Sequence, residues 1–590
     1  MNCTMLKGSK ILAVLAAAFF LSWLVLILQL RVIYVNISGV APLGMVNLLF
    51  PYFWVILIAF ITICFFTLKQ RDSPRWLHII LLAQLSLMLY YTPFLLGGFS
   101  WSPDSLWHGG VADYMPSILS GSKFPLTEYA QSYPLSFLVT YGIESLFSLD
   151  VVTYTLYVFP PICIVLISTF AYFFALRLFN KRIAFLAMLL AFPALHYIEP
   201  HVSPFAMGTV FLLASLVLLT FKGAKSTVFS LLLIVAVTLA HPISPIFLGI
   251  YLCVALFVNL LFKENSVNLY SVGIVGNLFH NYKPKVSPIN RNVWRLILLL
   301  LFLGAIWFYW TIYQASPNYV GVRTPVSKVF DLSFITNLIH TFEWTASGQG
   351  FIYPQISQLS LFVYALFLVS IIIIFMTNLL KLRHRKKVGE SRPILLTLTL
   401  TAIASGVMSY LLFSSSGERF LLGRGLIFFL IMGSICIATY LAGPNIKKPN
   451  FKIAVAFVFV LFLVCTFPII SYSKEAYNTF TPSAEAGLIF LSENIDLSQK
   501  TLSMTSDQQL AAYADLTKGL NLIGFPPTNL SYQKPDVVVL RVNSYYLISM
   551  RYDLSLTQNS YTRLCDNLTE NQLYDKVYSN AKFEIYLRSL

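Results

Sequence analysis

Charge is what this sequence has least of. Only 11% of its 590 residues are charged, against about 25% in an ordinary soluble protein. Hydrophobic residues make up 57% of the chain, and the mean hydropathy is +0.74. Runs of about 20 apolar residues recur along most of it, and each is long enough to cross the hydrocarbon core of a bilayer. The sequence therefore predicts a polytopic α-helical membrane protein and excludes a soluble globular one.

Cysteine is scarce as well, and several familiar signals are missing. The seven cysteines are scattered and lie mostly inside apolar runs, so they indicate neither a disulfide framework nor a metal-binding spacing. The sequence contains no internal repeat, low-complexity segment or glycine-rich nucleotide loop. The net charge of +16 comes from basic residues in alternate short loops. That is the positive-inside pattern, which we favour over nucleic-acid binding.

The apolar runs predict about thirteen transmembrane helices in a domain spanning residues 1–472. The first run, Ile11 to Leu30, is longer than a signal-peptide core and has no small-residue cleavage site close behind it, so we expect a membrane span. If Lys7 and Lys10 are cytoplasmic, every strongly basic turn falls on the same side, including the most basic one, Lys381 to Lys387. This topology predicts a cell-membrane protein with a cytoplasmic N-terminus.

The tail, residues 473–590, differs in character from the rest of the chain. Helix-like stretches (AEAGLIFLSEN, QQLAAYADLTKG) alternate with strand-like ones (TLSM, DVVVLRV, FEIYL). The pattern predicts a small α/β domain, and the span count places it outside the cytoplasm. The sequons at Asn529 and Asn567 agree with that placement, although the motif is common by chance.

The polar segment 99–134 separates two long apolar runs and concentrates ionisable residues. It contains Asp104, His108 and Asp113 among several tryptophans and tyrosines. Asp104 and His108 are four residues apart, so on a helical turn they share a face. Polar, acid-bearing sequence at a membrane boundary is costly unless it has a function. We therefore interpret this segment as the catalytic outer loop of a membrane enzyme.

Other polar groups are predicted on the same outer side. The topology places there HYIEPHVSP, HPISP and SSSGERF, with their charged and histidine residues, whereas the cytoplasmic side offers mainly Lys and Arg. The members of this outer set are Asp104, His108, Asp113, His196, Glu199, His201, His241, His340, Glu343, Glu418 and Arg419. The asymmetry points to a reaction or a binding event on the extracytoplasmic face.

These motifs resemble those of the GT-C superfamily, the membrane glycosyltransferases that use lipid-phosphate-linked sugars. The shared features are W-x-x-D-x-x-W-H around Asp104, G-x-x-x-P from Gly121 to Pro125, Tyr133-Pro134 at the start of a helix, and the outer HPISP. The pattern is similar to that of archaeal-type members, and a small terminal domain ending VYSNAKFEIY resembles theirs. One departure is that Ser105 and Leu106 follow Asp104, where many members carry a paired acid. It leaves metal dependence and catalytic competence open.

The resemblance implies transfer of a sugar from a polyprenyl-phosphate-linked donor to a glycan, lipid or protein acceptor in the cell envelope. Such chemistry needs a base for the acceptor hydroxyl and a cation for the departing phosphate. Asp104 is the candidate base, with Asp113 as a second carboxylate. Arg419 or Arg424 is the candidate phosphate ligand. His108 and His241 would either bind a divalent metal such as Mg²⁺ or Mn²⁺ together with Asp104, or orient the reacting groups.

Each of these residues also has a structural interpretation. Asp104 is a candidate helix N-cap, His108 a polar residue on an interfacial helix, and the His241-Pro242 pair punctuation between two spans. Arg419 is a candidate for snorkelling to the interface. His196 and His201 are interpreted first as interfacial anchors.

Two other functions stay open from the sequence. One is a transporter or lipid flippase, against which stand the few charges within spans and the lack of a repeat with paired broken helices. The other is a non-catalytic membrane scaffold whose tail binds surface polymers, an alternative that the unpaired Asp104 keeps open.

Overall fold

The computed structural model describes most of the membrane domain and five strands of the tail. The described residues are 3–36, 46–70, 72–97, 103–113, 115–120, 128–150, 153–195, 200–261, 293–311, 354–383, 391–416, 419–443, 449–472, 501–504, 521–524, 537–541, 574–580 and 583–588. Side chains are described for most of these positions, but not for Asp104, Asp113, Arg419 or the strands.

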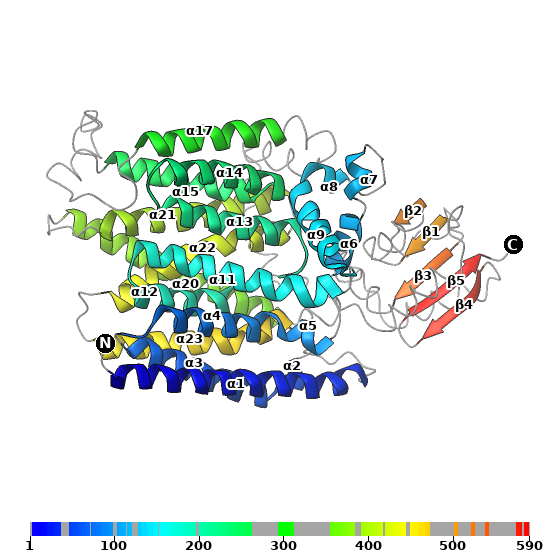
Figure 1. Cartoon of the computed structure of the whole chain (residues 1–590), viewed down its shortest axis with the longest axis horizontal. Coiled ribbons are helices and arrows are strands. Elements are labelled where there is room, and N and C mark those ends of the chain that lie inside the picture. Colours follow the sequence, from blue (N-terminus) through cyan, green and yellow to red (C-terminus); the bar gives the residue numbers. More distant parts are fainter. Residues whose placement is uncertain are drawn as a thin grey trace.

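A helix lies in each of the thirteen predicted spans, and these helices form one elongated bundle (Figure 1). They are α1 (Cys3–Asn36), α3 (Tyr52–Lys69), α4 (Arg75–Tyr90), α11 (Phe159–Leu178), α12 (Lys181–Ala194), α13 (Pro204–Leu219), α14 (Ala224–Ala240), α15 (Ser244–Leu261), α17 (Val293–Tyr309), α20 (Pro354–Arg383), α21 (Ser391–Ser416), α22 (Arg419–Ala442) and α23 (Pro449–Tyr472). In the described part of the chain, 8 helices are long and apolar enough to cross a membrane, and four others are apolar but shorter. The full count of thirteen spans stays a prediction.

Two predicted spans are shorter than expected because the helix is interrupted. The run from Met45 divides into α2 (Val46–Leu49) and α3, with Pro51 at the position before α3. Proline has no N–H to donate to a continuing helix, so α3 starts anew after it. The run from Trp76 to Gly98 likewise divides at Tyr91 into α4 and α5 (Thr92–Gly97), where Pro93 follows.

Helix α12 lies at the centre of the bundle. Its side chains from Ile183 to Ala194 are all buried, and it packs against α22, α11, α23 and α4. The side chain of Asn180 caps its start by accepting hydrogen bonds from the N–H groups of Arg182 and Ile183, both at 3.0 Å. At its other end the hydroxyl of Tyr90 donates to the carbonyl of Phe192 at 2.6 Å. The same hydroxyl lies 3.1 Å from the carbonyl of Leu195, so Tyr90 ties α4 to the end of α12.

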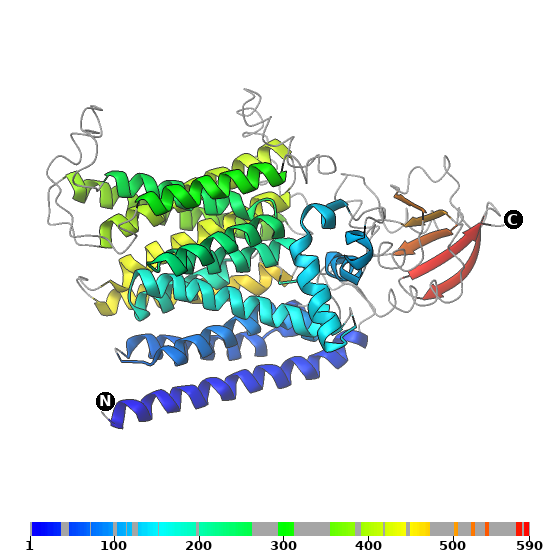
Figure 2. The same ribbon diagram turned by 45° about the horizontal axis from the view of Figure 1, so that its top comes forward.

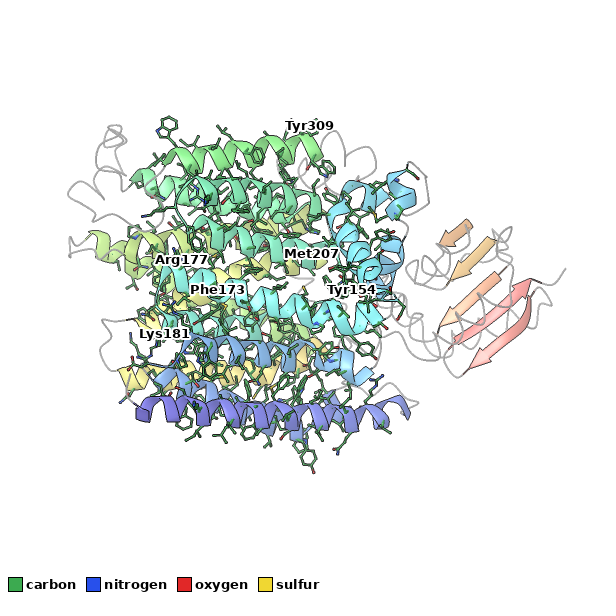
Figure 3. The ribbon with its side chains drawn as sticks, in the orientation of Figure 1. Tyr154, Phe173, Arg177, Lys181, Met207 and Tyr309 are labelled. Carbon is green, nitrogen blue, oxygen red and sulfur yellow. The ribbon has the colours of Figure 1, made fainter. Side chains whose placement is uncertain are left out.

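Basic side chains tie the turns at one end of the bundle together; we call it the basic end. Lys181 donates to the carbonyl of Ser73 at 2.7 Å, which joins the turn before α12 to the turn before α4. The guanidinium of Arg177 lies 4.2 Å from the ring centroid of Phe221, and buried Arg295 at the start of α17 donates to the carbonyl of the same Phe221. Figure 3 shows Arg177 and Lys181 at this end and Tyr154, Met207 and Tyr309 at the other.

Short helices cover the opposite end, which we call the α6 end. They are α6 (Pro103–Asp113), α7 (Met115–Leu119), α8 (Glu128–Ser132) and α9 (Pro134–Phe147), followed by the π-turn η1 (Tyr154–Val158) that leads into α11. Both Figure 1 and Figure 2 show them beyond the ends of the long helices, on the side where the strands lie. The predicted outer loop 99–134 is therefore largely helical in its described part.

The tail contributes a mixed five-stranded sheet in the order β2-β1-β3-β5-β4. The strands are β1 (Thr501–Met504), β2 (Asn521–Gly524), β3 (Val537–Arg541), β4 (Tyr574–Asn580) and β5 (Phe583–Arg588). β1 pairs in parallel with β2 and β3, whereas β5 pairs antiparallel with β3 and β4. The three predicted strands are confirmed as β1, β3 and β5, while the predicted helices of the tail lie outside the described residues.

Candidate functional site

Helix α6 is held over the end of the bundle by a small apolar core of its own. Val111 and Ala112 of α6 are fully buried against Phe137 of α9 and Met115 of α7. Helix α9 in turn lies against α13 and α14. This packing fixes α6 between the short helices and the ends of the long ones. The residues that α6 presents inward therefore face the turns of the bundle.

Both predicted carboxylates belong to α6. Asp104 is the second residue of the helix and Asp113 is the last. Asp104 therefore lies inside the helix, and the expectation that it is the capping residue before the helix is wrong. Proline is favoured at the first helical position, where its missing N–H costs no hydrogen bond, and Pro103 occupies that position. The side chains of Asp104 and Asp113 lie outside the described residues.

His108, one turn beyond Asp104, points into the α6 end. Its side chain is only 7% exposed. Its ring centroid lies 5.6 Å from that of Phe137 and 6.4 Å from that of His201. The expectation of a polar residue on a solvated interfacial face does not fit this burial. His108 is an inward-facing histidine.

His201 lies in the short turn before α13 and is also buried. Next to it, the N–H of Val202 donates to Ser105 Oγ of α6 at 3.2 Å. Ser203 caps α13 by accepting from the N–H of Ala206, and Pro204 occupies the first helical position. The cap fixes the turn, and the bond to Ser105 fixes the turn against α6. Together they hold the imidazole of His201 beside that of His108.

His241 lies in the turn between α14 and α15 and is 1% exposed. The N–H of Ile243 donates to its Nδ1 at 3.2 Å. Neutral imidazole carries one proton, so an Nδ1 that accepts a hydrogen bond leaves the proton on Nε2. His241 is thus a hydrogen-bond donor through Nε2.

Arg424 of α22 lies near His241, because both side chains pack against the same aromatic ring. Its guanidinium lies 5.1 Å from the ring centroid of Phe205, and that ring packs edge-on against His241 at 5.1 Å. Burial lowers the pKa of His241 well below its ordinary value, and the charges of Arg424 and His108 lower that pKa further. His241 is therefore neutral near pH 7, beside a permanent cation.

The glycine at position 208 allows the turn with His241 to lie close to α13. A Cβ added to Gly208 would lie 2.6 Å from Ser244 Oγ and 2.9 Å from His241 Cβ. Real Cβ contacts are not that short, so only glycine fits at this point of α13. Ser244 is fully buried, and among the described residues its hydroxyl has no hydrogen-bond partner.

The predicted residues are thus brought together in part. His108, His241 and Arg424 come from three segments far apart in sequence and interact electrostatically at the α6 end. Arg419 is the first residue of α22, and its side chain, like those of Asp104 and Asp113, lies outside the described set. The roles of these three residues stay predictions.

The predicted metal set includes Asp104, whose side chain lies outside the described residues, so the metal site stays a prediction. No group of three His, Cys, Asp or Glu side chains that could hold a metal ion occurs among the described residues. In addition, the bond from Ile243 uses the free lone pair of His241 Nδ1, which leaves no lone pair on neutral His241 for a metal. We therefore derive no step through a metal ion.

Sequence reasoning missed part of this cluster. Phe205, Gly208, Ser105 and Ser244 were not singled out, and His201 was interpreted as an interfacial anchor. A signal was present, because HVSP at 201–204 and HPISP at 241–245 both place a histidine shortly before Ser-Pro. Ser-Pro begins α13 and opens α15, so both histidines lie in turns at helix starts.

Comparisons with known proteins give distant structural similarity. No protein-family model matches the sequence, and no curated protein matches it. The oligosaccharyltransferase of Archaeoglobus fulgidus, in a crystal structure tethered with an acceptor peptide containing the NVT sequon, has a TM-score of 0.49 and 14% identity over 88% of this chain and 74% of that chain. ArnT from Cupriavidus metallidurans bound to undecaprenyl phosphate has a TM-score of 0.43 and 13% identity over 86% of this chain and 97% of that chain.

At TM-scores below 0.5, the similarity assigns no donor, acceptor or residue role to this chain. Those assignments are argued below from the sequence and geometry of the chain itself.

Proposed function

We propose that the chain is a membrane glycosyltransferase of the GT-C type. It moves a sugar from a polyprenyl-phosphate-linked donor to a glycan, lipid or protein acceptor at the α6 end, which faces the extracytoplasmic side. The observation that carries the proposal is the convergence of buried His108 and His241 with Arg424 beneath the helix that also bears Asp104. A lone structural histidine does not require such a gathering.

The positions suit a displacement at the anomeric carbon of the donor. The carboxylate of Asp104 takes the proton of the acceptor hydroxyl, whose oxygen forms the new bond to the anomeric carbon. The bond from that carbon to the phosphate oxygen breaks, and the electron pair leaves with the polyprenyl phosphate. Asp113 is the second carboxylate of α6.

The departing phosphate gains negative charge, which Arg424 stabilises. Arginine offers several N–H donors in a planar fork that matches phosphate oxygens. The guanidinium lies against the ring of Phe205, 5.1 Å from the ring centroid. Neutral His241 donates from Nε2 to a phosphate or sugar oxygen, and His108 orients groups on the α6 side. Arg419, at the start of the same helix as Arg424, is the second candidate cation.

The first test removes the proposed base. Asp104→Asn should lower sugar transfer from a polyprenyl-phosphate sugar by about 10²–10⁴-fold, as expected for loss of a general base. Asp72→Asn is the matched control, because Asp72 is exposed in a turn at the basic end. Unchanged transfer by well-expressed Asp104→Asn would remove this residue from the mechanism.

The second test removes the proposed phosphate ligand. Arg424→Gln should lower transfer by about 10²–10³-fold, the usual loss for a donor that stabilises transition-state charge. Arg177→Gln is its control, since Arg177 also packs on a phenylalanine ring but at the basic end. Transport of a lipid or solute by the protein in liposomes, with no glycan product, would favour the transporter instead.

A further inference from the structure

A groove lies on the side of the bundle. It runs between α20 and α23, has a volume of about 560 Å³, and is lined by apolar side chains alone. These are Phe362, Leu366, Phe451, Ala454, Val455, Val458, Phe459 and Phe462. Two aromatic contacts mark where the helices meet, Phe362 with Phe462 at 6.0 Å and Phe367 with Phe459 at 5.7 Å between ring centroids.

On α23 the lining of the groove extends from the basic end to the middle of the bundle, and on α20 it consists of Phe362 and Leu366, in the half of that helix nearer its start. Arg424, near the start of α22, lies at the α6 end, so the C-terminal part of that helix and the start of α23 lie at the basic end. The last residue of α23, Tyr472, donates to the carbonyl of Leu89 near the end of α4, back at the α6 end. The lining therefore begins at the basic end with Phe451 and ends midway along α23 at Phe462.

The length of the groove matches one leaflet of a bilayer. From Phe451 to Phe462, α23 rises by about 16 Å, at about 1.5 Å per residue. A hydrocarbon core of about 30 Å gives about 15 Å for each leaflet. A chain in this groove would reach from the interface at the basic end to the middle of the membrane.

A cation lies at the interfacial end of the groove. Lys452 follows Phe451 and shares a helix face with Val455 and Phe459, three and seven residues further on. Its ammonium is positioned by Tyr440 of α22, whose carbonyl it contacts at 3.4 Å and whose ring centroid lies 4.1 Å away. A half-buried cation above a wholly apolar groove is complementary to an anionic headgroup above an acyl chain.

We propose that this groove is a binding site for an anionic phospholipid of the leaflet at the basic end. One acyl chain lies between α20 and α23, and the phosphate faces Lys452. The leaflet that faces the cytoplasm carries anionic lipid that attracts basic residues, which agrees with the predicted orientation. The site is independent of the proposed transferase chemistry, which takes place at the opposite end of the bundle.

Two other occupants are distinguishable from a phospholipid. A polyprenyl-phosphate donor would have its phosphate near Arg424, at the other end. A second copy of the chain would change the oligomeric state when the groove is filled. Each becomes an outcome of the experiment.

The experiment uses the purified full-length protein and phosphatidylglycerol with a photoreactive acyl chain, against phosphatidylcholine with the same chain. Cross-linking should map to 449–472 and 354–383 with phosphatidylglycerol preferred. Ala454→Trp, which fills the groove, should abolish labelling at these helices. Lys452→Gln should reduce the preference for phosphatidylglycerol by about fivefold, the value of one basic residue at a lipid surface.

Two variants at the same end of the bundle serve as controls. Lys10→Gln removes an exposed charge from α1, and Ala17→Trp adds the same ring to an exposed alanine on that helix. Both should leave the labelling and the preference unchanged. The proposal is overturned if Ala454→Trp and Lys452→Gln behave like their controls, if polyprenyl phosphate displaces the phospholipid from α23, or if Ala454→Trp changes the oligomeric state.

Discussion

Gly208→Ala is the sharpest single test of how the α6 end is built. Gly208 is where α13 presses against the turn that carries His241 and Ser244. The new methyl would lie 2.6 Å from Ser244 Oγ and 2.9 Å from His241 Cβ, whereas comfortable contacts are about 3.5–4.0 Å. The turn must therefore move by about 0.5–1 Å. Such a movement displaces His241 without changing any ionisable group.

The magnitude follows from two opposing effects. Replacing glycine by alanine inside a helix stabilises it by about 1 kcal/mol, because alanine loses less backbone entropy. Inserting a methyl into a packed site costs about 1–3 kcal/mol. We expect a net loss of about 0–2 kcal/mol. Gly304→Ala isolates the first effect, since nothing lies within 4 Å of a Cβ there.

The assay combines thermal unfolding in detergent with sugar transfer. Gly208→Ala should melt below Gly304→Ala and lose about tenfold or more in transfer, since small displacements in a site are amplified in rate. Adding Ser244→Ala removes the nearest obstructing oxygen and should restore part of both losses. If Gly208→Ala matches Gly304→Ala in melting and transfer, the close approach of α13 to the turn is refuted.

Three further predictions concern other parts of the bundle. Arg295→Met should cost about 1–3 kcal/mol of stability, because it removes the donor to buried Ser226 and to the carbonyl of Phe221. Arg177→Gln should cost less than about 1 kcal/mol. Denaturant unfolding compares the two variants, and equal losses would contradict a structural role for the Arg295 hydrogen bonds. Trp310→Phe should lower sugar transfer several-fold with little loss of expression, because Trp310 Nε1 donates at 2.6 Å to the carbonyl of Ser132, where α8 meets α9. Unchanged transfer kinetics would argue against a role for this hydrogen bond. Burial lowers the pKa of His241, so below about pH 6.5 its imidazole takes up a proton in the unfolded chain but stays neutral in the folded one. Stability should therefore fall as the pH drops below 6.5, and the slope of melting temperature against pH should be smaller in His241→Gln. Identical slopes in the two proteins would contradict this prediction.

The position of the helices was predictable from the sequence because hydropathy acts locally. Each run of apolar residues must satisfy its own backbone hydrogen bonds in lipid, and a helix does so without help from distant residues. The placement of the basic turns was also predictable, because it follows from local charge. Arg177, Lys181 and Arg295 all lie at one end of the bundle. Strand patterns in the tail were likewise readable for β1, β3 and β5, while β2, Asn521–Gly524, was missed.

The helical nature of segment 99–134 was only partly predictable. Its short helices have small apolar faces that need one another, as the packing of Val111 and Ala112 against Phe137 shows. Sequence reasoning identified the helical spacing of Asp104 and His108 and a helix start at Tyr133-Pro134, but it predicted none of the short helices between them. Local composition does not reveal a face whose partner lies about 25 residues away along the chain.

By itself, the sequence predicted a bundle of membrane helices with its basic turns on one side and most of its histidines on the other. Only the tertiary structure decided which of those polar residues meet. Arg424 is 183 positions from His241 and 316 from His108 in the printed sequence, yet their charges act on one imidazole. Contacts of that kind depend on how whole helices cross and on the single glycine that lets α13 approach a turn, and neither leaves a periodic signal in the chain.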